Sequence, residues 1–477
     1  MMSVSVSSVA PTGPTRGREV PVTLLEVAPR TLGLLDQLGL WGNLGVSLLG
    51  FAGALAILAP SGAGPLSLSA AITSMVVGSV LGGLVLGATL VLGARTGAPA
   101  MVLLRGLLGA RASFVPTVLN IAQCLGWAVF ELVVISQALQ ALTRGHLPLS
   151  VCVVLAGLVT TGLTIRPLGA IRVLRKYVSG LVVLALVVLV IGLLAHPMGP
   201  VSGSWSGFWL AVDAAVALTI SWVPLGADYS RHSRSPRTAF TGGFLGYGVM
   251  QISCLLIGVL ALAQLRQNPD RIFDLFLSLP LGSAAFAVLV LRETDQSFAN
   301  VYSTAVSIQN MAPRWDRRVL TVLIGAGTTV TALTVDIAQY QNFLYLIGAV
   351  FIPLSGALVA GWWRTNGIGW DVSPQAPTRP GMLAAWVTGF AVYQLINPGS
   401  IAGWSDIWTK LGHLVHTLGH PWLSASVASF AVAAVLALPF AAPKPGHLAV
   451  PPDSGEQHSL LATRRPNTGA HPKRHLR

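Results

Sequence analysis

Twelve stretches of this chain are apolar enough and long enough to cross a lipid bilayer, and only short segments separate them. A transmembrane helix needs about 20 predominantly apolar residues. The stretches lie near residues 38–58, 69–93, 115–142, 149–165, 178–196, 207–227, 240–264, 280–306, 319–335, 340–362, 382–397 and 423–441. Only 9% of the residues are charged, whereas soluble domains average roughly 25%. The sequence therefore predicts an all-α integral membrane protein with about twelve transmembrane helices.

The segments outside these stretches limit what else the chain contains. Residues 1–30 and 442–477 are rich in Pro, Ser, Gly and Arg without periodicity, so we expect disordered tails on either side of a transmembrane domain at 31–441. The first residues contain no apolar run and do not resemble a secretory signal. The connections between spans are too short to hold a soluble catalytic domain.

The net charge of +13 is best explained by orientation in a membrane. If the N-terminus lies in the cytoplasm, 24 of the 29 Lys and Arg residues fall on the cytoplasmic side. Cytoplasmic loops of membrane proteins carry such an excess of basic residues. We therefore expect an even number of spans, both termini in the cytoplasm, a multi-pass location in the cell membrane, and no nucleic-acid partner.

Two of the predicted spans carry helix-breaking and polar residues in their middle. The first span reads LWGNLGVSLLG and the sixth reads AVALTISWVPLGADYSR. Interrupted spans at corresponding positions of two halves are typical of transporters built from inverted repeats, where unwound backbone binds substrate and ions. The two interruptions lie five spans apart, as a five-plus-five repeat requires. A simpler alternative is that glycine and proline only bend packed helices. Polar residues at the interruptions that we consider as substrate contacts are Asn43, Thr219 and Ser221.

The third span places a flat aromatic group next to an acidic group. Asn120, Trp127 and Glu131 lie seven and four residues apart, so they share one face of a helix. An indole offers a stacking surface and a carboxylate offers a strong hydrogen-bond acceptor, and a planar heteroaromatic ligand needs both. Alternatively, Glu131 forms a structural ion pair with Arg292, the only basic residue in the middle of a predicted span.

The eighth span contains a dense polar group, RETDQSFAN at 292–300, inside an apolar stretch. Ionisable side chains at membrane depth are costly unless they face the bundle interior or a water-filled cavity. The amides of Gln296 and Asn300 offer donors and acceptors that match the edge of a pyrimidine or purine. The hydroxyl of Thr294 and the carboxylate of Asp295, with carbonyls of the first span, form an oxygen-rich set suited to Na⁺, although the carboxylate could instead take a proton. A further alternative is that Asn300 only joins two helices.

Four stretches resemble the nucleobase–cation symporter-1 family, and within it the purine–cytosine permease branch. They are GARTGAPAMVLLRGLLGARASFVPTVLNIAQCLGW at 93–127, PLGADYSRHSRSPRTAFTGGFLGY at 224–247, ETDQSFANVYSTAVSIQN at 293–310, and LWGNLGVSLLG in the first span. They occur in the order of the family, and with the span pattern they cover roughly residues 33–440. The resemblance implies the bacterial leucine transporter fold, with one repeat at about 36–196, an inverted repeat at about 207–362, and two accessory helices at about 382–441.

The resemblance also implies substrate-binding roles at matching positions. Trp127 matches a tryptophan that stacks on the substrate, and Gln296 and Asn300 match amides that hydrogen-bond the base. Glu131 departs from the family pattern, because relatives usually have an amide there. Trp222 lies in the helix that carries a second aromatic group, and we include it among the substrate-binding candidates.

A cation site is implied in the same way. Leu291 through its carbonyl, Thr294 and Asp295 match the cation position, and Gly42 and Asn43 of the first span lie nearby. Asp295 departs from the pattern, because sodium-coupled members tend to have a hydroxyl residue there. We expect no cofactor, and no metal beyond a possible Na⁺ at this site.

The residues and the resemblance together predict a secondary active symporter that imports cytosine or a related purine or pyrimidine base with H⁺ or Na⁺ by alternating access. The alternative is a carrier of hydroxymethylpyrimidine or another thiamine precursor, because SWVPLGADYSR is similar to that branch too. The spans contain no DDxxD or HExxH motif and no nucleophile–base pair, so we do not expect an enzyme.

Overall fold

The computed structural model describes residue 20 and residues 28–60, 63–168, 179–197, 202–335, 340–367, 369–418, 420 and 422–441, with Ala52, Asp295, Tyr340 and Gln341 described by their backbone alone. The two tails that we predicted to be disordered, 1–30 and 442–477, fall almost entirely outside these residues. Where it is described, the chain forms helices and no strand.

Every predicted span coincides with one helix or with consecutive helices, which confirms the all-α prediction. In chain order the helices are α1 (Leu34–Leu44), α2 (Leu48–Gly53), α3 (Leu55–Leu58), α4 (Leu68–Thr96), α5 (Ala100–Leu108), α6 (Phe114–Leu142), α7 (Leu149–Ile165), α9 (Ser179–Leu194), α10 (Phe208–Ile220), α11 (Val223–Ser230), α12 (Pro236–Thr241), the π-helical turn η2 (Gly242–Tyr247), α13 (Gly248–Gln264), η3 (Pro269–Arg271), α14 (Ile272–Ser278), α15 (Gly282–Met311), α16 (Arg317–Ala332), α17 (Tyr340–Thr365), α18 (Pro380–Ile396), α19 (Trp404–Leu414), α20 (Ala425–Ala437) and η5 (Leu438–Phe440). The short helices α5, α14 and α19 lie in connections where no helix was predicted.

Much of the described chain has the length and polarity of membrane helices. Five helical stretches are long and apolar enough to cross a bilayer: Leu68–Thr96, Phe114–Leu142, Phe208–Ser230, Pro236–Gln264 and Asn342–Thr365. The helices of the first predicted span, bent by 51° at their break, form a sixth candidate, and four further apolar helices are shorter. Large apolar side chains on α7 and α9 face outward, among them Leu158 at 67% exposure and Ile191 at 63%. Such a surface suits lipid rather than water, while the count of twelve spans stays a prediction.

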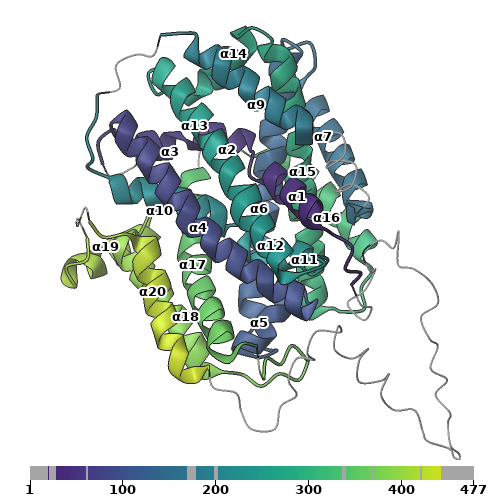
Figure 1. The fold of residues 1–477 in the computed structure, drawn as a ribbon, viewed down its shortest axis with the longest axis vertical. Coiled ribbons are helices and arrows are strands. Elements are labelled where there is room, and N and C mark those ends of the chain that lie inside the picture. Colours follow the sequence, from purple (N-terminus) through teal and green to yellow (C-terminus); the bar gives the residue numbers. More distant parts are fainter. Residues whose placement is uncertain are drawn as a thin grey trace, which may run out of the picture.

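Close helix packing surrounds the two interrupted spans. The long helices α6 and α15 pack against each other, and α17, α18 and α20 lie together at one edge of the molecule (Figure 1). Helix α4 approaches α10 closely, since a Cβ on Gly78 would lie 2.6 Å from the Cβ of Ala215 and one on Gly82 would lie 2.7 Å from the Cβ of Thr219. Small residues at four-residue spacing permit this approach.

The first interruption, between α1 and α2, passes very close to the start of α13. Gly45 follows α1, and a Cβ there would lie 2.5 Å from the carbonyl oxygen of Tyr247 and 3.1 Å from the amide nitrogen of Gln251. Only glycine fits this contact. Residues 45–47 are not helical. The amides of Gly45 and Val46 still bond to the carbonyls of Trp41, Gly42 and Asn43, whereas the carbonyl of Leu44 accepts from a side chain instead.

The second interruption, between α10 and α11, follows from a proline. Pro224 stands in the first turn of α11, and without an N–H it cannot donate to the carbonyl of Ile220 four residues earlier. The next amide, on Leu225, bonds to the carbonyl of Trp222 at 3.3 Å, which leaves the carbonyl of Ser221 without a helical partner. The first interruption therefore separates two helices, whereas the second breaks the hydrogen-bond ladder inside the helical stretch Phe208–Ser230.

A buried aspartate fastens the accessory helix α20 to α10. Asp213, which is 1% exposed, accepts hydrogen bonds from the hydroxyl of Ser424 and from the amides of Ala425 at 2.9 Å and Ser426 at 3.1 Å. Amides in the first turn of a helix have no partner within the helix. The carboxylate therefore satisfies donors at the start of α20 and holds this helix to α10.

Asp213→Ala should destabilise the protein, because three buried donors would lose their acceptor. An unsatisfied buried donor costs about 1–3 kcal/mol, so we expect the free energy of unfolding to fall by about 3 kcal/mol. Asp213→Asn keeps one acceptor oxygen and should lie between wild type and Asp213→Ala. Thermal unfolding of the purified protein in detergent, followed by tryptophan fluorescence, measures this order. Equal melting temperatures for wild type and Asp213→Ala would contradict the anchoring role.

Candidate functional site

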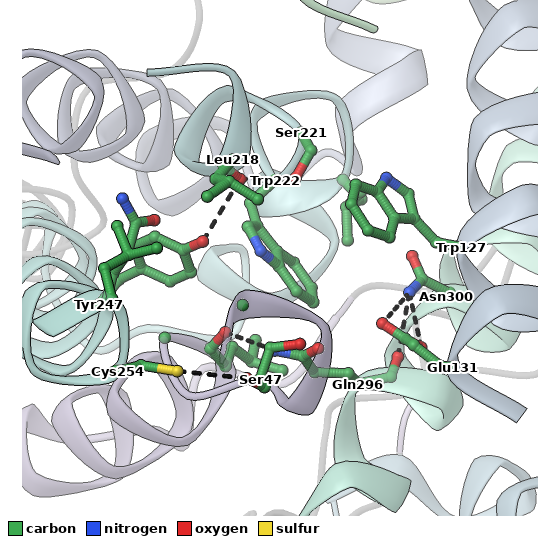
Figure 2. Close-up of a pocket in the computed structure, with 16 residues that line it drawn as sticks. Ser47, Trp127, Glu131, Leu218, Ser221, Trp222, Tyr247, Cys254, Gln296 and Asn300 are labelled. Atoms are coloured by element: carbon green, nitrogen blue, oxygen red, sulfur yellow. Dashed lines mark hydrogen bonds between the residues drawn. The ribbon is translucent and has the colours of Figure 1, made fainter. Parts of the chain in front are cut away.

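A cavity lies between the two helix interruptions, and residues of η2, α6, α13 and α15 complete its wall (Figure 2). The space between its side chains amounts to about 510 Å³, part of it open to solvent. The lining residues are Leu44, Gly45, Ser47, Gly50, Trp127, Glu131, Leu218, Ser221, Trp222, Leu225, Tyr247, Gln251, Cys254, Leu255, Gln296 and Asn300.

Two indole rings, those of Trp127 on α6 and Trp222 at the second interruption, form part of this wall (Figure 2). Both are held by neighbouring rings. Trp127 packs edge to face with Phe343 at 5.4 Å between ring centroids, and Trp222 packs in the same way with Trp41 at 6.4 Å. Tyr247 lies 6.3 Å from Trp222 on another side. Rings fixed in this manner can provide stacking surfaces for a planar ligand.

The side chains of Glu131 and Asn300 join α6 to α15 beside the indoles (Figure 2). The amide nitrogen Nδ2 of Asn300 lies 3.2 Å and 3.1 Å from the two carboxylate oxygens of Glu131. A carboxylate only accepts hydrogen bonds, so this contact fixes which end of the amide faces it. The amide oxygen of Asn300 consequently points away from Glu131, toward the side on which Trp127 and Trp222 lie (Figure 2). Both residues thus offer acceptors to the cavity.

Glutamine side chains of α6 and α15 donate hydrogen bonds to backbone carbonyls at the two interruptions. Nε2 of Gln296 donates to the carbonyls of Leu44 at 2.8 Å and Val46 at 2.9 Å. Nε2 of Gln123 donates to the carbonyl of Ser221 at 3.1 Å. Buried backbone groups without such partners are costly. The two helices that line the cavity therefore also stabilise both interruptions.

Arg292 and Glu293 form a fully buried ion pair at the first interruption. Nη1 of Arg292 lies 2.8 Å from Oε2 of Glu293, and neither side chain is exposed. Nη2 of Arg292 donates to the carbonyl of Asn43 near the end of α1. The alternative of an ion pair between Arg292 and Glu131 is therefore wrong, because Arg292 pairs with its neighbour and Glu131 bonds to Asn300.

The chain that enters α1 is tied to the chain that leaves α11. The amide of Leu32 donates to the carbonyl of His232, and the amide of Arg234 donates to the carbonyl of Leu32, both at 2.9 Å. Nδ1 of His232 lies 2.9 Å from the carbonyl oxygen of Pro29, which can only accept, so this nitrogen carries the proton. Burial lowers the pKa of His232 to about 3, and the ring is neutral near pH 7. The two interrupted spans are therefore linked at this end.

Most of the residues predicted to contact a substrate lie at the cavity. Those that line it are Trp127, Glu131, Ser221, Trp222, Gln296 and Asn300. Asn43 and Thr219 do not line it, because each faces a neighbouring helix. The amide nitrogen of Asn43 lies 3.2 Å from the hydroxyl of Ser179 on α9, and the hydroxyl of Thr219 donates to Oε1 of Gln251 at 2.9 Å. Their proposed contact with a substrate stays a prediction.

The residues predicted for a cation site differ in the oxygen atoms that they could offer to an ion. Gly42 faces η2, since a Cβ on it would lie 3.6 Å from the carbonyl oxygen of Gly246. The hydroxyl of Thr294 donates to the carbonyl of Leu291 at 2.7 Å within α15. The side chain of Asp295 lies outside those that the structure describes. The described part of this site therefore presents fewer free oxygens than the sequence suggested.

Three polar cavity residues were missed: Ser47, Tyr247 and Gln251. Gln251 is an amide in the middle of the apolar stretch 240–264, and the cost of a polar group at that depth was a usable signal. Ser47 directly follows the first interruption and could have been included with it. Tyr247 had no such signal, because it ends a π-helical turn and simple helical spacing does not predict its direction.

Comparison with known proteins finds one matching family model and several solved structures with a similar fold. A family model described as permease for cytosine/purines, uracil, thiamine and allantoin matches residues 41–375. Mhp1, a nucleobase-cation-symport-1 family transporter in a closed conformation with bromovinylhydantoin bound, is 18% identical with a TM-score of 0.70, and the match covers 89% of this chain and 94% of Mhp1. MhsT in complex with L-phenylalanine is 14% identical with a TM-score of 0.52, and the match covers 84% of this chain and 97% of MhsT. A Na⁺-coupled sialic acid symporter is 13% identical with a TM-score of 0.55, and the match covers 88% of this chain and 92% of that protein. No curated protein sequence matches the chain. The predicted bacterial leucine transporter fold is confirmed.

Gln296→Met should destabilise the first interruption, because two carbonyls lose their donor while the side-chain volume changes little. An unpaired buried carbonyl costs about 1–3 kcal/mol, so the free energy of unfolding should fall by roughly 2–4 kcal/mol. The matched control is Gln375→Met, whose side chain is exposed and outside the cavity. Thermal unfolding in detergent compares the three proteins, and a Gln296→Met protein as stable as the control would show that these bonds do not stabilise the interruption.

Proposed function

This chain belongs to the family of permeases for cytosine, purines, uracil, thiamine and allantoin, and we propose that it is a secondary active symporter importing cytosine or a related purine or pyrimidine base with H⁺ or Na⁺. It crosses the cell membrane many times with both termini in the cytoplasm, and the lipid bilayer covers its apolar faces. The observation that carries the proposal is the cavity between two interrupted helices, where indoles and hydrogen-bonding groups converge.

In the proposed complex the base lies flat against Trp127, with Trp222 as a second aromatic wall. The acceptor oxygens of Glu131 and Asn300 take N–H groups on the edge of the base. Gln296 contributes its amide oxygen, because its nitrogen is engaged by the first interruption. A base with two N–H donors on one edge suits this set best. The exocyclic amino group of cytosine carries two such hydrogens, as does that of adenine, so we place amino-bearing bases before uracil and hypoxanthine and use cytosine as the first probe.

A carrier of hydroxymethylpyrimidine is the second candidate. Its aminopyrimidine ring also has an exocyclic amino group, so the same acceptors suit it. Counterflow in proteoliposomes loaded with labelled cytosine separates the candidates, with adenine, hypoxanthine, uracil and hydroxymethylpyrimidine as competitors and with Na⁺ and pH gradients tested separately. Counterflow driven by hydroxymethylpyrimidine but not by cytosine would favour the second candidate.

Transport in this proposal proceeds by alternating access. In folds with inverted repeats, a bundle that contains the interrupted helices rocks against the remaining helices around a fixed site. The backbone hydrogen bonds between Leu32 and residues 232–234 support a joint motion of the two interrupted spans. Helices α6 and α15 belong to the part against which these spans move, since they carry Trp127, Glu131 and Asn300 on the other side of the cavity.

Trp127→Ala and Asn300→Ala should each abolish most uptake of labelled cytosine by a protein that still folds. Loss of an aromatic ring that stacks on a base costs about 1–3 kcal/mol, or roughly tenfold to hundredfold in affinity. Asn300→Ala removes an acceptor for the base and the partner of Glu131. The control is Trp315→Ala, because Trp315 is 59% exposed and remote from the cavity. Uptake like that of wild type in a folded variant would remove that residue from the site.

Glu131→Gln should change which bases compete with cytosine. The amide of glutamine can donate to a carbonyl oxygen of the ligand, whereas the carboxylate can only accept. We expect the preference for cytosine over uracil to fall by about tenfold, which corresponds to about 1.4 kcal/mol. The ratio of inhibition constants for the two bases in counterflow measures this preference. An unchanged ratio would show that position 131 does not read the edge of the base.

A further inference from the structure

At the first interruption, where the sequence predicted a coupling cation, the chain supplies a positive charge of its own. The side chain of Arg292 is 0% exposed, and its guanidinium donates to the carbonyl of Asn43. Asn43 is the second-last residue of α1, so this carbonyl lies where the helix stops. Such carbonyls are the groups that unwound helices offer to ions. Here the carbonyl accepts from the amide of Val46 at 3.1 Å and from a guanidinium nitrogen, which lies where an ion would bind.

Glu293 balances this charge and closes the other side of the interruption. Its carboxylate lies 2.8 Å from Arg292 and accepts hydrogen bonds from the hydroxyl of Ser47 at 3.0 Å and the amide of Leu48 at 3.1 Å. Both carboxylate oxygens are therefore engaged by the chain that leads into α2. The ion pair thus joins the end of α1 to the start of α2 through two consecutive residues of α15.

Two further carbonyls at the interruption face a donor as well. Leu44 and Val46 both accept from Nε2 of Gln296, at 2.8 Å and 2.9 Å. A sodium ion needs several oxygen ligands that are not already directed at N–H groups. A second cation would also lie close to the buried guanidinium of Arg292, where little water screens the repulsion. The oxygens of Asn43, Leu44, Val46 and Glu293 are therefore directed at N–H or O–H groups beside a fixed positive charge, an arrangement that does not suit a sodium ion.

We propose that Arg292 is a tethered cation that replaces sodium at the first interruption, so that uptake by this chain does not require a sodium gradient. The uptake part of this inference rests on the proposed function. The ion-binding part stands without it, because it concerns only the residues around Arg292.

Uptake of labelled cytosine by the full chain in proteoliposomes tests the first part. Replacing sodium by choline at constant pH should leave the initial rate unchanged. Two coupled ligands usually change each other's binding about fivefold or more, so a sodium-dependent increase of that size would overturn the inference. If the folded protein takes up none of the five bases in any gradient, the proposed function fails, and the binding measurement below still decides the inference.

Binding of radioactive sodium to the purified protein in detergent tests the second part. Wild type should show no saturable binding. Arg292→Ala leaves the Asn43 carbonyl, the Ser47 hydroxyl and the Glu293 carboxylate around a space without a cation, so it should gain saturable sodium binding. Arg292→Lys keeps the positive charge and should not gain it.

Saturable binding by wild type would overturn the inference, and so would a folded Arg292→Ala protein that binds no sodium. A purely structural role for Arg292 would destabilise Arg292→Ala without any gain of sodium binding, so this measurement separates the two roles. If Arg292→Ala does not fold, the binding and uptake measurements on wild type decide the inference without it.

Discussion

The two interrupted helices depend on side-chain donors from α6 and α15, because carbonyls buried in a membrane domain have no water to bond. Gln296 and Arg292 supply donors to the first interruption, and Gln123 supplies one to the second. In the predicted inverted repeats, α10 is the counterpart of α1, and α15 is the counterpart of α6. If the chain is divided into these predicted repeats, each interruption is bonded by a helix of the opposite repeat. This exchange of donors explains why one cavity forms between the two interruptions instead of two separate kinks.

The same two helices hold the interruptions and carry the groups that face the cavity. They are also bonded to each other, through Asn120 and Ser307 at 2.8 Å and through Asn300 and Glu131. Any motion of the interrupted spans relative to α6 and α15 must carry these bonds along or exchange them. The bonds from Arg292 and Glu293 involve charged groups and are the strongest of the set. In the proposed rocking motion, the bonds between the first interruption and α15 are therefore the costliest to exchange.

Much of the fold could be predicted because apolar runs of span length have few alternatives, and the stretch 149–165 coincides with α7. The interruptions were predictable from local chemistry, since Pro224 removes a donor and Gly45 permits a close contact. Partners across helices were not predictable. Helical spacing gives the face on which a residue lies but not which neighbour it contacts. Arg292 was therefore considered as the ion-pair partner of Glu131, although it pairs with Glu293. Asn43 faces α9 for the same reason.

A carboxylate at position 131 affects more than its own hydrogen bonds. Because it can only accept, it draws the amide nitrogen of Asn300 toward itself and turns the amide oxygen to the side of the indoles (Figure 2). An amide at this position could accept or donate, and Asn300 could then take either orientation. The acceptor character of this wall therefore comes from Glu131 alone, although two residues form it. A ligand without N–H donors would leave buried oxygens unpaired, and an unpaired buried group costs more than an ordinary hydrogen bond contributes. We therefore attribute the proposed preference for amino-bearing bases to the carboxylate at position 131 rather than to the shape of the cavity.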